Sequence, residues 1–214
     1  RVVHVNAGPE FPLPKKELPP YLPRFAEGIL DFASRKGFTY DLIHSHYWMS
    51  GIAAEMLQNA WHVPVVHMFH TLGHMKNKVA QHPSEVEGDY RLQGEQHCMD
   101  IADRIIASTP AEVDQMTTLY RLDPRKVEVI PPGVDLSHFY PIPKDEARAA
   151  IGIAQDVQMI LFVGRIEPLK GIDTLLKALA LMREECHFAE CPFQLVIIGG
   201  DPDSSLDQAS SEMT

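Results

Sequence analysis

The sequence predicts an α/β protein with doubly wound, mainly parallel sheets. Short runs rich in β-branched residues alternate along the chain with segments of helical periodicity. Several of the runs are continuously apolar, which is typical of strands buried on both faces of a parallel sheet. The predicted strands are residues 2–6, 41–44, 65–70, 104–108, 127–130, 159–163 and 194–198.

Four segments between these strands carry helix signals. Thr109 is a predicted N-cap, with Pro110 at the first helical position and Glu112 as the partner in a capping box. Gly37 ends another predicted helix, because glycine adopts the left-handed C-cap conformation without strain. The apolar stripes are Ile29 and Phe32; Met49, Ile52, Ala53, Met56 and Ala60; Val113, Met116 and Tyr120; and Ile172, Leu175, Leu176 and Leu179.

Proline-rich stretches divide the chain. Residues 10–23 predict a surface loop, and residues 131–144 (PPGVDLSHFYPIPK) predict a domain boundary between strands. We expect residues 1–138 to form a nearly complete first domain that lacks its first strand, and residues 139–214 to begin a second, truncated domain. Because the chain opens inside a predicted strand at Arg1 and not at Met, we expect it to be a piece of a longer protein.

Charge and composition restrict the partners. The 214 residues include 19 Lys and Arg against 29 Asp and Glu, a formal net charge of −10, so nucleic acid and anionic membrane surfaces are poor candidate partners. The longest apolar run has the length of a strand, so the sequence predicts no transmembrane segment. Three cysteines without C-x-x-C spacing argue against disulfides and predict a reducing, cytoplasmic location.

The segment FVGRIEPLKG contains the clearest candidate anion site. A buried strand brings Gly164 and Arg165 to its carboxyl end, and a turn places Lys170 just before a helix. Two cations beside the free N–H groups of a helix start suit a diphosphate without any metal. Spacing alone leaves open that these are solvated surface cations, with Glu167 as the ion-pair partner of Arg165.

Eleven histidines invite a metal hypothesis, which the spacing does not favour. His44 and His46 lie two apart on a predicted strand and therefore share a face, while His67, His70 and His74 cluster downstream. No H-E-x-x-H or comparable set of three ligands is present, so we expect no metal site. We expect His44 and His67 to be core or supporting residues, and His62, His82 and His138 to be surface residues.

Four segments together resemble one enzyme family. The strings YDLIHSHYWMSG, VVHMFHTLGHMKN, VIPPGVDLSHFYP and GRIEPLKGIDTLLKALA are similar, in the same order, to retaining glycosyltransferases of family 4 (group 1). The likeness is greatest to the branch with sucrose-phosphate synthases and D-inositol-3-phosphate glycosyltransferases. It implies the GT-B architecture of two Rossmann-like domains, the first binding the acceptor and the second the nucleotide-sugar.

The resemblance also implies roles for individual residues. Gly164, Arg165 and Lys170 would bind the donor diphosphate, and His70 would lie near the donor sugar, with His70, Arg165 and Lys170 as the catalytic set. The acceptor and its phosphate would be bound by Lys15, Tyr47, Thr71 and Arg91. A shift of one residue would replace Lys15 by Lys16. Without the resemblance, packing at the sheet edge is the favoured interpretation of Tyr47 and Trp48, and ligand contact is the alternative.

The implied reaction moves a sugar from a nucleotide-sugar, such as a UDP-sugar, to a small phosphorylated sugar or polyol. It would need no cofactor or metal and no side-chain base, because the leaving phosphate accepts the acceptor's proton on the front face. Two alternatives stay open: a lipid-linked or glycan acceptor, and a non-catalytic sugar- or nucleotide-binding module. The family's glycine-rich opening loop and later acidic motif fall outside the chain, so we expect the isolated chain to be inactive. The donor base, the transferred sugar and a homodimeric state are left open.

Overall fold

The computed structural model describes residues 2–167, 170–185 and 193–200. The chain divides into two compact units, one formed by Arg1–Lys78 with His82–Gly133 and the other by Val79–Gln81 with Val134–Thr214. The break after Gly133 falls inside the proline-rich stretch 131–144.

The first unit contains a parallel four-stranded sheet, which agrees with the predicted fold class. Its strands are β1 (Ile43–His46), β2 (Val65–Met68), β3 (Arg104–Ala107) and β4 (Val127–Val129), arranged in the order β1-β2-β3-β4. Ile43 lies opposite Val65, and Ile105 lies opposite Val127. Because all four strands run in one direction, their carboxyl ends lie at one edge of the sheet.

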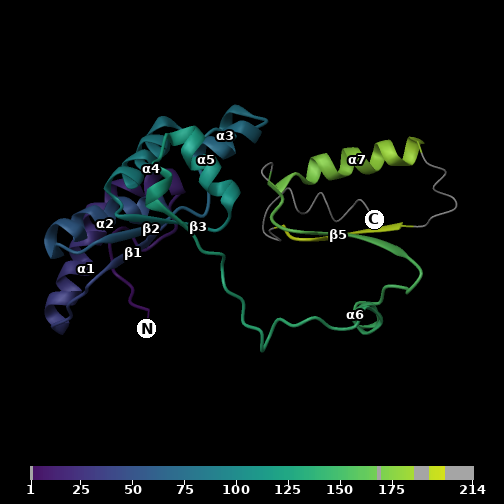
Figure 1. The fold of residues 1–214 in the computed structure, drawn as a ribbon, viewed down its shortest axis with the longest axis horizontal. Helices are drawn as coiled ribbons and strands as arrows, with labels where there is room; N and C mark the ends of the chain where they lie inside the picture. Colours follow the sequence, from purple (N-terminus) through teal and green to yellow (C-terminus); the bar gives the residue numbers. More distant parts are fainter. Residues whose placement is uncertain (1, 168–169, 186–192, 201–214) are drawn as a thin grey trace. The chain divides into compact units, whose positions relative to one another are not determined.

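Helices are gathered around this sheet, as Figure 1 shows for the purple to teal part of the ribbon. They are α1 (Leu22–Lys36), α2 (Trp48–Trp61), α3 (Gly73–Val79), α4 (Asp89–Ile101) and α5 (Pro110–Tyr120). Gly37 closes α1 in the left-handed conformation with φ 64°, as predicted. At α5, Thr109 Oγ1 accepts a hydrogen bond from Glu112 N at 3.3 Å, but the Glu112 carboxylate accepts from Ser108 N, so only half of the predicted capping box forms.

The core of the first unit lies between the sheet and these helices. Phe69, Met99, Ile105 and Met116 are fully buried in one cluster. A second cluster under α1 and α2 contains Ala26, Ile43, Ala53, Ala54, Leu57 and Val65. Since burial of one large apolar side chain contributes about 1.5–3 kcal/mol, these clusters fix the strands whose ends carry the candidate site.

One prediction for the N-terminal region is wrong, and the boundary of another differs by two residues. Residues 2–6 form no strand, and Val2 is 81% exposed. A strand needs a neighbouring backbone, and in the described sheet β1 pairs only with β2. The predicted loop 10–23 also ends early, because α1 begins at Leu22 with Pro23 in its first turn, where a missing N–H costs nothing.

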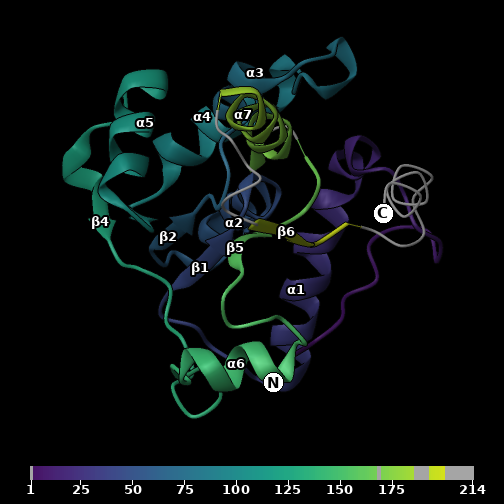
Figure 2. The ribbon, with the colours of Figure 1, turned by 90° about the vertical axis from the view of Figure 1, so that its right-hand side faces the viewer.

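The second unit contains α6 (Lys144–Ala150), β5 (Gln158–Val163), α7 (Ile172–Glu185) and β6 (Phe193–Ile198). Strands β5 and β6 are parallel, with Gln158 opposite Phe193 and Val163 opposite Ile198, so both predicted strands are confirmed. Figure 2 shows the two strands side by side with α7 over one face. Among the described residues of both units, no helix combines the length and hydrophobicity needed to cross a bilayer.

Candidate functional site

The candidate site of the first unit begins where β1 and β2 end. Tyr47 directly follows β1, and its N donates to Met68 O, the last residue of β2, at 2.8 Å. Tyr47 has φ 70° and, just beyond β2, His70 has φ 62°. Side-chain-bearing residues seldom adopt positive φ, and each such residue costs on the order of 1–3 kcal/mol. Strained residues after two adjacent strands make this edge the candidate functional site.

Arg91 lies on α4 and projects its charge into this edge. Its side chain is only 4% exposed. Nε donates to Glu95 Oε1 at 2.7 Å, and Nη2 donates to Thr71 O at 3.2 Å and to Thr71 Oγ1 at 3.1 Å. Burial by itself would lower the pKa of Arg91, but the hydrogen bond and charge of Glu95 outweigh it and raise that pKa. The guanidinium is therefore both fixed and charged.

Tyr47 lies between two of the predicted acceptor cations. Lys15 Nζ is 5.0 Å from the centre of the Tyr47 ring, and Arg91 Cζ is 5.3 Å from it. The Tyr47 hydroxyl is buried and has no hydrogen-bond partner within the described part of the chain. The structure thus brings together the four predicted acceptor residues Lys15, Tyr47, Thr71 and Arg91. Of the two candidate lysines, Lys15 is the one in contact with Tyr47.

Three charged residues of this cluster were missed by the sequence reasoning: Lys76, Glu87 and Glu95. Glu87 accepts from Lys76 Nζ at 2.8 Å and from Arg91, and Glu95 is fully buried beneath Arg91. The run EGDYRLQGE places the two carboxylates four residues before and four residues after Arg91, which is the spacing of side chains that meet on a helix. That spacing was the signal that could have identified Glu87 and Glu95 from the sequence.

The predicted sugar-contacting residue, His70, belongs to a histidine cluster. His70 Nε2 lies 2.8 Å from His46 Nδ1, and the rings of His44 and His46 are 4.2 Å apart. His44 and His46 share one face as predicted, and both are exposed. His44 is therefore not a core residue, and its contact with the His46 ring fits the alternative of a supporting residue. Burial, followed by the charges of His44 and His70, lowers the pKa of His46.

His67 lies on β2 and is 1% exposed, as expected for a core residue. Its Nδ1 lies 2.7 Å from Ser45 Oγ, and burial together with the neighbouring histidines lowers its pKa to about 3. His62, His82 and His138 are exposed, as expected. Within the described ranges, no three His, Cys, Asp or Glu side chains are placed to hold a metal ion.

The predicted anion site of the second unit follows β5. Gly164 N donates to Ile198 O at 2.9 Å, and Arg165 Nη1 is 2.6 Å from Glu167 Oε1. Arg165 is 71% exposed, and Lys170 is exposed two residues before α7 begins. Both interpretations therefore stay open. Two exposed cations beside the start of a helix are consistent with an anion site, and the ion pair of Arg165 with Glu167 is consistent with solvated surface cations.

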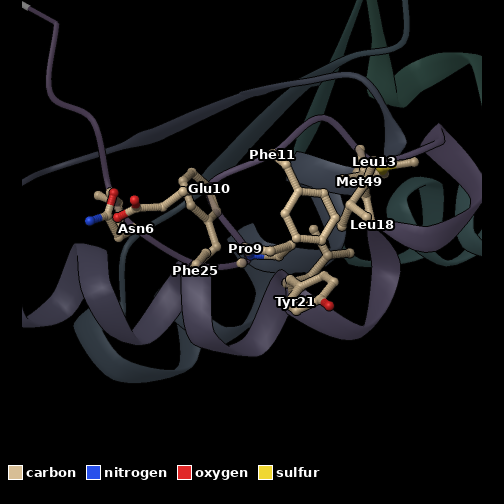
Figure 3. Close-up of a pocket in the computed structure, with 13 residues that line it drawn as sticks. Asn6, Pro9, Glu10, Phe11, Leu13, Leu18, Tyr21, Phe25 and Met49 are labelled. Carbon is tan, nitrogen blue, oxygen red and sulfur yellow. The ribbon is translucent and has the colours of Figure 1, made fainter.

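A cavity of about 390 Å³ was not predicted from the sequence. It lies between the N-terminal segment and α1, where Figure 3 shows the rings of Phe11, Tyr21 and Phe25 along its wall with Asn6 and Glu10 toward one end. Its lining is mainly apolar, so it differs in chemistry from the charged cluster at Arg91.

Two successive units with parallel α/β sheets and polar loops at the carboxyl ends of their strands define a protein of two Rossmann-like units. Residues 1–138 match the family model of Glycosyltransferase Family 4, and residues 143–213 match the model of Glycosyl transferases group 1. The chain belongs to Glycosyltransferase Family 4.

Individual relatives agree with this assignment. The D-inositol 3-phosphate glycosyltransferase of Actinosynnema mirum is 42% identical over 207 residues, which are 96% of this chain and 50% of the relative. The solved sucrose-phosphate synthase of Thermosynechococcus elongatus is 30% identical with a TM-score of 0.79, covering 98% of this chain and 50% of that one. Anabaena Alr3699/HepE, solved in complex with UDP-glucose, is 19% identical with a TM-score of 0.60 over 94% of this chain and 49% of that one, a likeness of fold alone. The chain spans about half the length of the curated relatives it matches.

Proposed function

We propose that the protein containing this chain is a retaining glycosyltransferase that moves a sugar from a nucleotide-sugar to a small phosphorylated sugar or polyol. The observation that carries the proposal is the convergence of Lys15, Tyr47, Thr71 and Arg91 on one edge of the first sheet. The names of the relatives, D-inositol 3-phosphate glycosyltransferase and sucrose-phosphate synthase, are consistent with such an acceptor.

The chemistry of the cluster suits a phosphate monoester. An ammonium, a guanidinium and a phenol supply charge-assisted hydrogen bonds to phosphate oxygens. The Tyr47 hydroxyl is buried and unpartnered among the described residues, so a phosphate oxygen would satisfy it. Acceptor recognition in this proposal is therefore electrostatic, with Arg91 as the fixed element and Lys15 as the exposed, adaptable one.

For the donor, we propose that Arg165 and Lys170, with the backbone at Gly164, bind the diphosphate and that His70 contacts the sugar. Cleavage of a glycosyl–phosphate bond builds negative charge on the departing diphosphate, and cations placed there stabilise the transition state more than the ground state. The leaving phosphate would take the proton of the acceptor hydroxyl on the front face, so no side-chain base and no metal is needed. We extend the proposal to a UDP-sugar donor, as the family resemblance implies.

The free, buried thiol of Cys98 fits the proposed reducing cytoplasm.

The decisive experiment uses the full-length protein with UDP-sugars and pairs of acceptors that differ only by a phosphate. We expect kcat/KM to be at least about tenfold higher for the phosphorylated member, because charge-assisted hydrogen bonds are lost with the phosphate. Product NMR should show a retained anomeric configuration. Equal rates for both members, or no transfer to any acceptor, would contradict the proposal.

A further inference from the structure

One carboxylate oxygen in the first unit gathers three positive side chains. Glu87 Oε1 is 2.8 Å from Lys76 Nζ and 3.6 Å from Lys15 Nζ, and Arg91 Nη1 donates to the same oxygen. Lys15 and Arg91 belong to the proposed acceptor-phosphate site. The Glu87 carboxylate therefore already acts as an anion ligand of that site.

The backbone of Glu87 is fixed, while its carboxylate reaches the surface. Glu87 N donates to Asn77 Oδ1 at 2.7 Å, and Asn77 Nδ2 donates to Glu87 O at 3.0 Å. The Glu87 side chain is nevertheless 19% exposed. Rotation about its side-chain bonds can thus carry the carboxylate into solvent without moving the loop.

Arg91 does not depend on Glu87 for its orientation. Glu95, which has no exposed surface, holds Nε, and Thr71 holds Nη2 through two hydrogen bonds. If the Glu87 carboxylate leaves, the guanidinium keeps its position and gains a free donor at Nη1.

The charges favour an exchange of anions. Lys15, Lys76 and Arg91 face the carboxylates of Glu87 and Glu95, which leaves one net positive charge. Without the Glu87 carboxylate the cluster has two net positive charges, which matches the charge of about −1.5 to −2 on a phosphate monoester at pH 7. Burial would raise the pKa of Glu87, but the hydrogen bond from Lys76 and the charges of Arg91 and Lys15 lower it overall, so the resident carboxylate is ionised at neutral pH.

We propose that Glu87 is the resident anion of the acceptor site, which holds Lys15, Lys76 and Arg91 together until the acceptor's phosphate displaces its carboxylate. Lys76 then becomes a further ligand of the phosphate. An acceptor without a phosphate cannot compete for these cations, so Glu87 makes the site selective for dianionic acceptors. This inference rests on the proposed phosphorylated acceptor.

The test measures binding of inorganic phosphate to the full-length protein by calorimetry. Glu87→Gln removes the competing charge and should tighten phosphate binding about tenfold. Asp89→Asn is the matched control, since it removes one exposed negative charge two residues away, and it should change the affinity less than twofold. Adding Lys76→Met to Glu87→Gln should reverse most of the gain.

The outcomes separate this inference from the proposed function. Phosphate binding by the wild type that is unchanged or weakened in Glu87→Gln overturns the displacement and leaves the acceptor site standing. Absence of phosphate binding in both proteins overturns the displacement and the phosphorylated acceptor together. If thermal unfolding shows that Glu87→Gln does not fold, Glu87→Ala removes the same charge and the same comparison applies.

Discussion

Arg91 and Glu95 lie one helical turn apart on α4 and form an ion pair almost completely buried from solvent. Arg91 is 4% exposed and Glu95 has no exposed surface. The Glu95 carboxylate also accepts from Gly73 N at 2.8 Å and from the Tyr120 hydroxyl. One carboxylate thus ties α4 to the start of α3 and the end of α5, and these ties hold the cation of the candidate acceptor site.

Glu95→Gln should destabilise the first unit by roughly 3 kcal/mol, because removal of one partner leaves the buried charge of Arg91 without compensation. Urea unfolding at neutral pH measures the change. The same variant should lower the pKa of Tyr120 toward its ordinary value, since burial and the Glu95 hydrogen bond raise it. Asp100→Asn is the control on the same helix, because the Asp100 carboxylate accepts only a solvent-exposed hydrogen bond from the Gln96 side chain. This variant should change the free energy of unfolding by less than about 0.5 kcal/mol. Similar effects for the two variants would show that the buried network does not stabilise the unit.

Stability should fall as the pH drops below the ordinary pKa of histidine. The folded-state pKa of His67 is about 3, below its ordinary value of 6.5, so the unfolded chain binds the proton more tightly. The contribution of neutral His67 is complete above pH 6.5 and is lost progressively down to about pH 3. Between pH 6.5 and about pH 5 the loss should approach 2 kcal/mol. His67→Gln should flatten this part of the stability curve, and an equal slope in both proteins would rule His67 out as the cause.

The edge of the first sheet could be predicted from the sequence because the predicted strands run into small, polar or aromatic residues at their carboxyl ends. The helix α4 (Asp89–Ile101) could not be predicted from the sequence, because its buried face includes the charged residues Arg91 and Glu95. A search for apolar stripes discards such a helix, and the network of Glu87, Lys76 and Glu95 was missed with it. Conversely, the β-branched run at residues 2–6 has strand composition but no partner strand among the described residues, since composition does not supply hydrogen bonds.

Sequence reasoning also left Tyr47 and Trp48 open between packing and ligand contact. Trp48 is 3% exposed and belongs to the core cluster, so packing is its role. Tyr47 instead adopts positive φ between two cations. Neighbouring aromatic residues thus have different roles because a strand end changes the backbone direction between them.

Gly94 allows close packing of α4 against Trp48. An added Cβ at Gly94 would lie 2.7 Å from Cε3 of the Trp48 ring, which is buried and cannot move aside. Gly94→Ala should therefore destabilise the unit by about 1–2 kcal/mol, even though alanine favours a helix. A Cβ at Gly133 would meet nothing within 4 Å, so Gly133→Ala should be nearly neutral. Thermal unfolding of both variants checks this, and a stabilised Gly94→Ala would contradict the packing argument.

Tyr47→Phe should separate folding from ligand binding. The hydroxyl it removes is buried and has no partner within the described residues, so the Tm should stay the same or rise slightly. Phosphate affinity should fall about tenfold, because a hydrogen bond to a charged oxygen is lost. Calorimetry with inorganic phosphate measures this, with Tyr40→Phe as a control, since the Tyr40 ring packs on Trp61 at 4.9 Å away from this cluster. An unchanged phosphate affinity would remove Tyr47 from the proposed acceptor site.

Replacement of Arg165 or Lys170 by Ala in the full-length protein should slow the transfer step. Both cations are proposed to neutralise charge that develops on the leaving diphosphate, so kcat should fall by roughly a hundredfold. The KM for the acceptor should stay within about threefold, since neither residue is proposed to contact it. Lys177→Ala is the matched control, because it removes an exposed cation of α7 that pairs with Asp173 at 3.4 Å, and it should leave kcat unchanged. A loss that appears equally in kcat and in acceptor affinity would contradict the leaving-group role, because ground-state binding would then account for it.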